Sequence, residues 1–284
     1  MNPLFSSPDI LAFIDRCLAE DIGDGDHSAN ACIPLSAQGQ SRMLIKEAGI
    51  IAGLELAEVV FHRVDPNLQI THLIQDGTRV EPGDVALTVS GSARHILTAE
   101  RLVLNLCQRL SGVATSTHRY VQELEGLHTK VLDTRKTTPG MRLLEKWAVK
   151  TGGGENHRIG LYDMIMIKDN HADFCGGLEA AIDQVHAYLA ERKLNLRIEV
   201  ETRNLQEVER TLAKGGIHRI MLDNFDIPSL REAVKLINGR YETEASGGIT
   251  LATLRSYAET GVDYISVGAL THSVKSLDIS LKAV

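Results

Sequence analysis

The feature that most constrains this chain is a regular alternation of short apolar segments and helical patterns after about residue 128. Strands are predicted at 130–133, 164–168, 196–201, 219–223, 242–245 and 264–267. Helices are predicted between several of them, at 177–192, 204–214, 227–237 and 251–260. Because such alternation gives parallel strands joined by right-handed crossovers, the pattern favours an α/β fold with an incomplete (β/α) barrel. A doubly wound open sheet is the alternative.

The chain before about residue 110 lacks this rhythm. It predicts helices at 8–20, 54–63 and 95–110, strands at 41–47, 68–75 and 85–89, and a turn at 81–84. Mixed elements of this kind are typical of a small α+β domain with an open sheet. We therefore expect an N-terminal α+β domain over residues 1–112, joined by the C-terminal segment 273–284, and a barrel domain over residues 113–272.

Composition narrows the classes of function. The formal net charge is −7 and aromatic residues make up 4% of the chain, which argues against binding to nucleic acid or to an acidic membrane. The sequence shows no signal-peptide pattern and no apolar stretch of about 18 residues that could span a membrane. The cysteines (Cys17, Cys32, Cys107 and Cys175) are dispersed, which is typical of reduced thiols. We expect a cytoplasmic protein.

Polar residues and glycines follow the predicted strands of the second half. Five strands run into residues 133–136, 168–171, 223–224, 246–248 and 268–269, and the remaining one carries Glu199 and Glu201. In barrels and open parallel sheets, the carboxyl ends of the strands form the active site. A single polar residue there would be an ordinary loop residue, but six in register predict a site.

The two glutamates of the third strand share one face, because side chains alternate along a strand. One interpretation is an edge strand with both glutamates in water. The other is a pair facing the barrel mouth, where Glu201 and Asp223 hold a hard divalent cation, Mg²⁺. Glu199 stays the alternative to Glu201 as the ligand from this strand.

A second group of candidate residues is basic: Arg101, Arg135, Lys136, His157, Arg158 and Lys168. Arginine grips carboxylate or phosphate with two hydrogen bonds, and lysine acts as a compact charge. The glycines at 152–154 allow a ligand to approach the backbone closely. Those at 247–248 and 268 precede predicted helix starts, where barrels commonly bind phosphate. Together these residues predict a pocket for a substrate with several negative charges.

Seven strings of residues resemble the quinolinate phosphoribosyltransferase family, also called carboxylating nicotinate-nucleotide pyrophosphorylases. They are TAERLVLN (98–105), LSGVAT (110–115), DTRKT (133–137), GGGENHR (152–158), IKDNH (167–171), LDNF (222–225) and GVDYISVGALTHS (261–273). They occur in the family's order and cover nearly the whole chain.

The resemblance implies a pentosyltransferase that converts quinolinate and phosphoribosyl pyrophosphate to nicotinate mononucleotide, pyrophosphate and CO₂, in de novo NAD biosynthesis. It implies quinolinate contacts from Arg135, His157, Arg158 and Lys168, with Arg101 donated by the second subunit of a homodimer. It implies handling of the pyrophosphate donor and Mg²⁺ by Lys136, Glu201 and Asp223, and of the 5′-phosphate by Ser246, Gly247, Gly248 and Gly268. Thr134 and His272 complete the implied substrate-binding set. The implied catalytic residues are Lys136, Lys168, Glu201 and Asp223.

Two other functions fit the same strand ends. One is a lyase or aldolase in which Lys168 forms a Schiff base with a carbonyl substrate. The other is a metabolite sensor that keeps the pocket without turnover. The nearby carboxylates argue against the first, and the complete set of charged positions argues against the second.

Overall fold

The structure is a computed structural model that describes residues 2–284. The chain divides into two compact units, and the boundary between Ser116 and Thr117 falls inside one long helix, α4 (Ala93–Glu123). The first unit contains the residues up to Ser116, with Pro139–Gly152 and Val274–Val284. The second contains Thr117–Thr138 and Gly153–Ser273. Each unit has its own sheet.

The first unit is built on a four-stranded antiparallel sheet in the order β12-β1-β5-β3. Its strands are β1 (Gln38–Ile45), β3 (Gln69–His72), β5 (Val85–Ser92) and β12 (Ile279–Ala283), and β2 (Gly49–Ile50) pairs separately with β4 (Arg79–Val80). Its helices are η1 (Pro3–Ser6), α1 (Pro8–Ile22), α2 (His27–Cys32), α3 (Leu54–Val64) and α5 (Arg142–Thr151). The last strand of the chain therefore completes the sheet that the first strand begins.

The second unit is built on a six-stranded parallel sheet in the order β6-β11-β10-β9-β8-β7. The strands are β6 (Lys130–Leu132), β7 (Met164–Ile167), β8 (Arg197–Thr202), β9 (Arg219–Asp223), β10 (Glu242–Ser246) and β11 (Tyr264–Ser266). The first strand lies beside the last, and the others follow in steps of one, as in a barrel opened between its first two strands. This order confirms the incomplete barrel and excludes a doubly wound sheet, whose strand order reverses.

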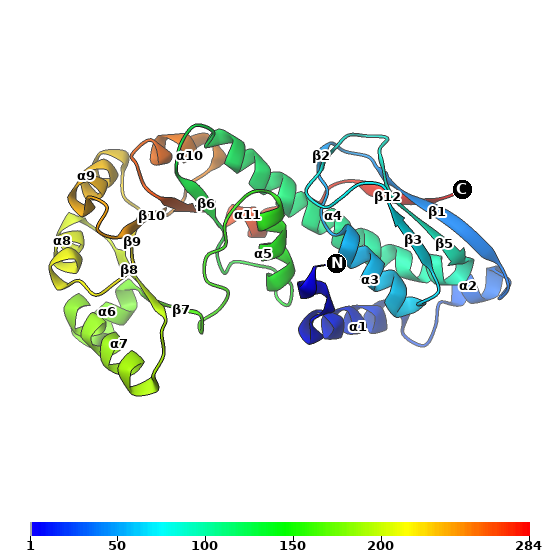
Figure 1. Ribbon diagram of the computed structural model, residues 1–284, viewed down its shortest axis with the longest axis horizontal. Helices are drawn as coiled ribbons and strands as arrows, with labels where there is room; N and C mark the ends of the chain where they lie inside the picture. The colour runs from blue at the N-terminus through cyan, green and yellow to red at the C-terminus, as the bar shows by residue number, and fades with distance from the viewer. Residues whose placement is uncertain (1) are drawn as a thin grey trace. The chain divides into compact units, whose positions relative to one another are not determined.

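Helices cover one side of this sheet, and Figure 1 shows them outside a barrel-like arc of strands. They are α6 (Asp169–Cys175), α7 (Leu178–Arg192), α8 (Leu205–Lys214), α9 (Ile227–Ile237) and α10 (Leu251–Ala258), while the short α11 (Ala269–His272) follows β11 and contacts the loop after β6. Local signals set their ends: the side chain of Asp226 accepts a hydrogen bond from the backbone N–H of Ser229 at the start of α9, and Asn238 ends it in the left-handed conformation. Because the strands are parallel, their carboxyl ends lie together along one edge of the sheet.

The structure differs from the sequence-based expectation at several elements. The helix predicted at 95–110 extends to Glu123, because buried residues such as Val113, Ala114 and Tyr120 continue its apolar face. The short helices α2, α5, α6 and α11 and the strand β12 were not predicted. Among residues 2–284, no helix combines the length and the apolar character needed to cross a membrane.

Candidate active site

The two faces of the parallel sheet differ in chemistry. On one face, Ile198, Val200, Ile220, Leu222 and Ala245 are each at most 1% exposed and form the apolar layer of the second unit. The other face is charged, as the strand register shows. In the register of the strands, Glu199 lies opposite Arg219, and Arg219 lies opposite Glu242. Two residues further along, Glu201 lies opposite Met221, and Met221 lies opposite Glu244. Asp223 then lies opposite Ser246.

The register bears directly on the two glutamates of β8. They share the charged face, as predicted, but they lie at different depths. Glu199 is fully buried and β8 lies between β7 and β9, so the interpretation of a water-exposed edge strand is wrong. Only Glu201 lies near the strand end, where its Oε2 is 3.4 Å from Nζ of Lys168.

Asp223 ends β9 on the same face and is oriented by its neighbour. Asn224 donates from Nδ2 to Oδ2 of Asp223 over 2.6 Å, and its backbone N–H donates to the carbonyl of Ser246 over 2.8 Å. Asn224 has a φ of 57°, which asparagine tolerates better than most residues. Glu201 and Asp223 therefore present two carboxylates at neighbouring strand ends, which are the ligand type that Mg²⁺ takes.

Glycine is required where Asn224 meets the loop after β10. A Cβ atom on Gly247 would lie 2.2 Å from Oδ1 of Asn224, and Gly247 has a φ of +103°. Both facts exclude a side chain at this position. Ser246, Gly247 and Gly248 therefore bring bare backbone to the strand end, as a phosphate-binding loop does.

A second close approach occurs after β11. A Cβ on Gly268 would lie 3.0 Å from the ring of His272 and 3.0 Å from Cδ of Lys136. The hydroxyl of Thr271 donates to the carbonyl of Lys136 over 2.9 Å, which ties this segment to the loop after β6. The backbone N–H of Lys136 in turn donates to Oγ1 of Thr134. The predicted residues Lys136, Gly268 and His272 are thus brought together.

Two cations lie close together beside these strand ends. Burial lowers the pKa of the half-buried Arg158 guanidinium, and the positive charge of Arg135 lowers it further. Nη1 of Arg158 donates to the carbonyl of Met164 over 3.2 Å, which fixes it against β7. Two neighbouring arginines repel each other, so the pair favours a multiply charged anion between them.

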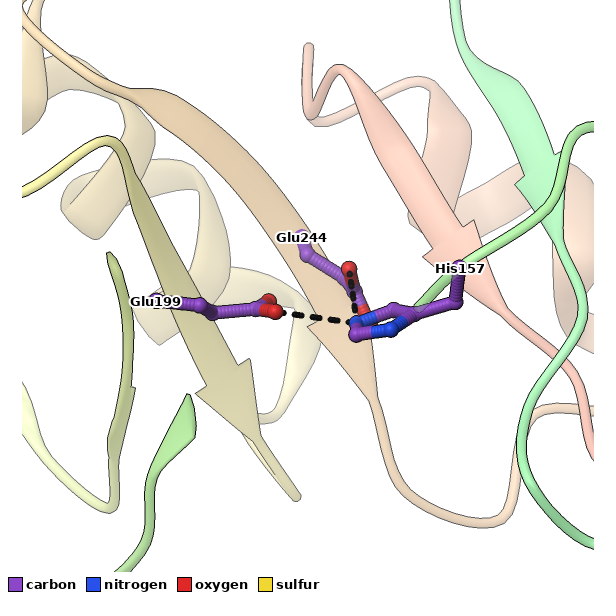
Figure 2. Close-up of side chains that lie close together, drawn as sticks. All are labelled: His157, Glu199 and Glu244. Carbon is purple, nitrogen blue, oxygen red and sulfur yellow. Dashed lines mark ion pairs between the residues drawn. The ribbon is translucent and has the colours of Figure 1, made fainter. Parts of the chain in front are cut away.

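His157 does not lie among the exposed cations. It is buried, with its Nε2 2.9 Å from Glu199 Oε2 and 3.5 Å from Glu244 Oε2. Figure 2 shows the imidazole ring between the two carboxylates, which come from different strands. Nη1 of Arg219 donates to Glu244 Oε2 over 2.9 Å. We call His157, Glu199, Arg219 and Glu244 the interior cluster.

Charges in the interior cluster are strongly perturbed. Burial and the negative charge of Glu244 raise the pKa of Glu199 to about 7. Burial alone would lower the pKa of His157, but its contacts with Glu199 and Glu244 outweigh burial and raise it to about 9. Burial alone would likewise raise the pKa of Glu244, but contacts with His157 and Arg219 outweigh it and lower the pKa.

The interior cluster also contains the donor set of a metal site. Among residues 2–284, His157, Glu199 and Glu244 form a group of three potential ligands whose atoms lie within 4.8 Å of one another. Arg219, however, already supplies a cation to Glu244. The carboxylates of the interior cluster are therefore already neutralised in part by a side-chain cation.

The predicted site residues fall into two groups. Those of the second unit lie on its strand ends and on the loop before β7: Thr134, Arg135, Lys136, His157, Arg158, Lys168, Glu201, Asp223, Ser246, Gly247, Gly248, Gly268 and His272. Arg101 lies in the first unit, exposed on α4. The sequence-based reasoning missed Arg219, Asn224 and Glu244, although Glu242 and Glu244 alternate on β10 as Glu199 and Glu201 do on β8.

Family models match both parts of the chain. Residues 26–111 match the N-terminal domain of quinolinate phosphoribosyl transferase, and residues 113–282 match its C-terminal domain. The chain is 48% identical over 295 residues to quinolinate phosphoribosyltransferase [decarboxylating] 1b of Nicotiana tabacum, covering 99% of this chain and 84% of the relative. It is 43% identical to a probable nicotinate-nucleotide pyrophosphorylase [carboxylating] of Synechocystis, covering 96% of this chain and 92% of the relative.

Solved structures of similar proteins have the same fold. NadC from Streptococcus pyogenes superimposes with a TM-score of 0.93 at 40% identity, covering 99% of this chain and 97% of that one. A nicotinate-nucleotide pyrophosphorylase from Francisella tularensis superimposes with a TM-score of 0.90 at 38% identity, covering 98% of both chains. The similarity therefore extends over both units.

Proposed function

Because the chain belongs to the quinolinate phosphoribosyltransferase family, we propose that its charged strand ends bind quinolinate beside phosphoribosyl pyrophosphate. The activity is that of the family: the phosphoribosyl group is transferred to quinolinate with loss of CO₂, a step of NAD biosynthesis. The observation that carries the site assignment is that Lys168 with Glu201, Asp223 with Asn224, and Gly268 with Lys136 lie together in contact at the ends of the parallel strands.

The reaction needs charge stabilisation rather than a side-chain nucleophile. The pyridine nitrogen forms a bond to C1 of the ribose, and the bond from C1 to pyrophosphate breaks. CO₂ then leaves and its electron pair stays on ring carbon 2, where the positive charge of the adjacent ring nitrogen stabilises it until a proton takes the place of the carboxyl group. The protein must therefore hold two anionic molecules in contact and stabilise the departing pyrophosphate.

Quinolinate is assigned to the cations around the loop before β7. Arg135 and Arg158 suit its two carboxylates, because guanidinium groups bind carboxylate in a bidentate manner. Lys168, exposed at the end of β7, adds a third charge. His157 adjoins Arg158 and belongs to the same proposed pocket.

The phosphoribosyl donor is assigned to the opposite side of the strand ends. Ser246, Gly247 and Gly248 offer backbone N–H groups to the 5′-phosphate, and Gly268 with His272 extends this surface. Lys136 lies against Gly268 and supplies a positive charge for the pyrophosphate. Thr134 accepts a hydrogen bond from the backbone of Lys136 and so shapes the same loop.

Mg²⁺ is the proposed cofactor, held by Glu201 and Asp223. The donor set fits a hard cation, since both ligands are carboxylates on one face of neighbouring strands and Asn224 orients Asp223. When bound, Mg²⁺ would supply positive charge to the pyrophosphate leaving group. Lys168, which lies against Glu201, would keep that carboxylate oriented toward the strand end.

A homodimer with a shared site is the proposed assembly. Arg101 is exposed on α4, within the family-like string at 98–105. We propose that it reaches the pocket of the second subunit and adds a charge for quinolinate. The two sites of a twofold dimer would be completed in the same way.

Cytoplasmic function is also a proposal. It is supported by the four free thiols, Cys17, Cys32, Cys107 and Cys175, which suit a reducing compartment. Several of the plant relatives, though not all, carry the word mitochondrial or chloroplastic in their names.

The rival functions differ in what Lys168 would have to do. A Schiff-base lysine is typically desolvated or lies beside another cation, whereas Lys168 is exposed and faces Glu201. A sensor without turnover would bind the same anions but release no product.

Product analysis tests the proposed function. Purified protein with quinolinate, phosphoribosyl pyrophosphate and Mg²⁺ should yield nicotinate mononucleotide and pyrophosphate, and omission of the donor should abolish both. Borohydride added with a carbonyl substrate should leave Lys168 unmodified. Trapping of Lys168, or binding of both substrates without products, would favour the lyase or the sensor.

A further inference from the structure

His157 makes three contacts through three different groups. Its backbone N–H donates to Oδ1 of the buried Asp133 over 2.9 Å, directly after β6. Its ring Nδ1 accepts from the backbone N–H of Arg158 over 2.7 Å. Its ring Nε2 lies against Glu199 on β8 and Glu244 on β10. One residue thus joins its loop to three strands of the sheet.

The hydrogen bonds assign the tautomer of the ring. A backbone N–H always donates, so Nδ1 of His157 accepts from Arg158 with its lone pair. In the neutral ring the proton resides on Nε2, which faces the carboxylate of Glu199. The raised pKa of His157 favours the charged ring, in which Nδ1 also carries a proton and the bond from Arg158 is lost, so the link described here belongs to the neutral form. The pair Nε2–H and Nδ1 therefore links the buried carboxylates to the backbone of Arg158.

The carboxylates of the interior cluster are themselves fixed. Glu244 accepts from Arg219, whose guanidinium also donates to Glu242 over 3.0 Å and lies 4.2 Å from the centre of the Tyr264 ring. Glu199 and Glu244 are fully buried and cannot be rehydrated without opening the barrel. Buried ion pairs contribute little to the net stability of a protein. The interior cluster is therefore better explained by the arrangement of side chains that it holds in place.

We propose that His157 is a positioning residue, anchored by Glu199 and Glu244, that holds Arg158 and the loop 152–158 in the geometry that receives quinolinate. The expected effect on quinolinate binding rests on the proposed function. The expected effect on the position of the loop 152–158 does not. The proposal assigns roles to Glu199, Glu244 and Arg219 in the same pocket. Arg158, and not the His157 ring, makes the contact with the substrate carboxylate.

The proposal is tested first by hydrogen–deuterium exchange of the loop 152–158. In Glu199→Ala and Glu244→Ala the ring loses its anchor, so the Arg158 amide should exchange about tenfold faster or more than in the parent chain. Glu199→Gln, which keeps a polar oxygen of similar reach beside Nε2, should restore most of the protection. Glu242→Gln is the matched control, because Glu242 lies on β10 like Glu244 and contacts Arg219, whereas His157 pairs with Glu199 and Glu244.

Steady-state kinetics supplies the second readout. The Ala variants should raise KM for quinolinate by about 10–100-fold and leave KM for the phosphoribosyl donor within about twofold, since a small misplacement of a binding group has effects of this order. A variant that merely lowers stability would not separate the two KM values. Should the Ala variants fail to fold, His157→Asn takes their place, because it keeps most of the side-chain volume while it removes the ring that contacts both carboxylates.

The outcomes are distinct. Unchanged amide exchange in folded Glu199 and Glu244 variants overturns the proposal whatever the catalytic result. If His157→Asn raises KM for quinolinate while the glutamate variants leave it unchanged, the ring contacts substrate directly and the positioning role is wrong. A parent chain that yields no nucleotide from quinolinate contradicts the proposed function, while the exchange data still decide the geometric part.

Discussion

Arg158 is half-buried beside Arg135, and both conditions disfavour its charge unless an anion is bound. Glu199 and Asp163 offset part of this effect, and a bound dicarboxylate would offset more of it. At the scale of single residues, the proposed site would draw its substrate affinity from a few cations rather than from the net-acidic surface. This is how a chain with a net charge of −7 can bind two anionic molecules.

Removal of either arginine should weaken quinolinate binding without unfolding the chain. We expect Arg135→Ala and Arg158→Ala each to reduce the binding free energy by about 2–4 kcal/mol, the usual loss for a desolvated charge-assisted pair. Titration of quinolinate followed by calorimetry measures this loss. Arg210→Ala is the control, because Arg210 on α8 pairs with Glu179 on α7. Unaltered affinity in both pocket variants would remove these residues from the site.

Removal of either proposed metal ligand should change the dependence on Mg²⁺. Asp223→Ala and Glu201→Ala should raise the Mg²⁺ concentration for half-maximal activity by about tenfold, equivalent to about 1.4 kcal/mol, while quinolinate alone still binds. Activity measured against Mg²⁺ concentration tests this. An unchanged metal dependence in both variants contradicts the assignment, and an effect confined to Glu199→Ala would transfer the role to the deeper glutamate.

The elements of the second unit could be predicted well because each strand is apolar on one face and ends in a polar residue. The ranges 219–223 and 227–237 agree with β9 and α9 at both ends. The alternation that places Glu199 and Glu201 on one face was also readable in the sequence. How far each glutamate lies below the strand end could not be predicted. This depth depends on the register between strands whose paired residues lie 20 or more positions apart in the sequence.

Other parts of the site depend on contacts that no local pattern carries. In the sequence, His157 is interpreted as one more cation of the segment 152–158. In the structure its ring lies between carboxylates from β8 and β10. Asn224 reads as a loop residue, yet it orients Asp223 and excludes a side chain at position 247. The strand β12 was missed because its partner, β1, lies more than 200 residues earlier.

The loop after β10 should tolerate no side chain at its first glycine. Gly247→Ala places a methyl group 2.2 Å from Oδ1 of Asn224 at a φ of +103°, so Asn224 and Asp223 must shift. We expect kcat/KM for the phosphoribosyl donor to fall by about 100-fold, as misplacement by about 1 Å can do. Gly239→Ala is the matched control, because Gly239 also has a positive φ but has open space around it. Equal effects of the two substitutions on activity would show that backbone strain alone is responsible.

At the scale of the whole molecule, the two units carry different parts of the proposed site. The strand ends belong to the second unit, whereas Arg101 belongs to the first. Since Arg101 is exposed, a neighbouring chain can reach it. In the proposed homodimer the site would be shared, so activity would depend on dimer formation.

Complementation between two inactive variants tests the shared site. Arg101→Ala and Lys168→Ala dimers should each be nearly inactive. Mixed by unfolding and refolding, they should form about half mixed dimers, each with one intact site, so that activity returns to about a quarter of the parent value. A mixed population that is demonstrably formed and still inactive would mean that Arg101 serves its own chain.

The central claim, that this site transfers phosphoribose to quinolinate and then releases CO₂, is tested most directly with quinolinate labelled in the carboxyl group at ring position 2. The account predicts one labelled CO₂ for each nicotinate mononucleotide formed, and none when phosphoribosyl pyrophosphate is omitted, because decarboxylation needs the positively charged ring nitrogen that the transfer creates. Labelled CO₂ released without the donor, or a nucleotide that retains the label, would contradict it.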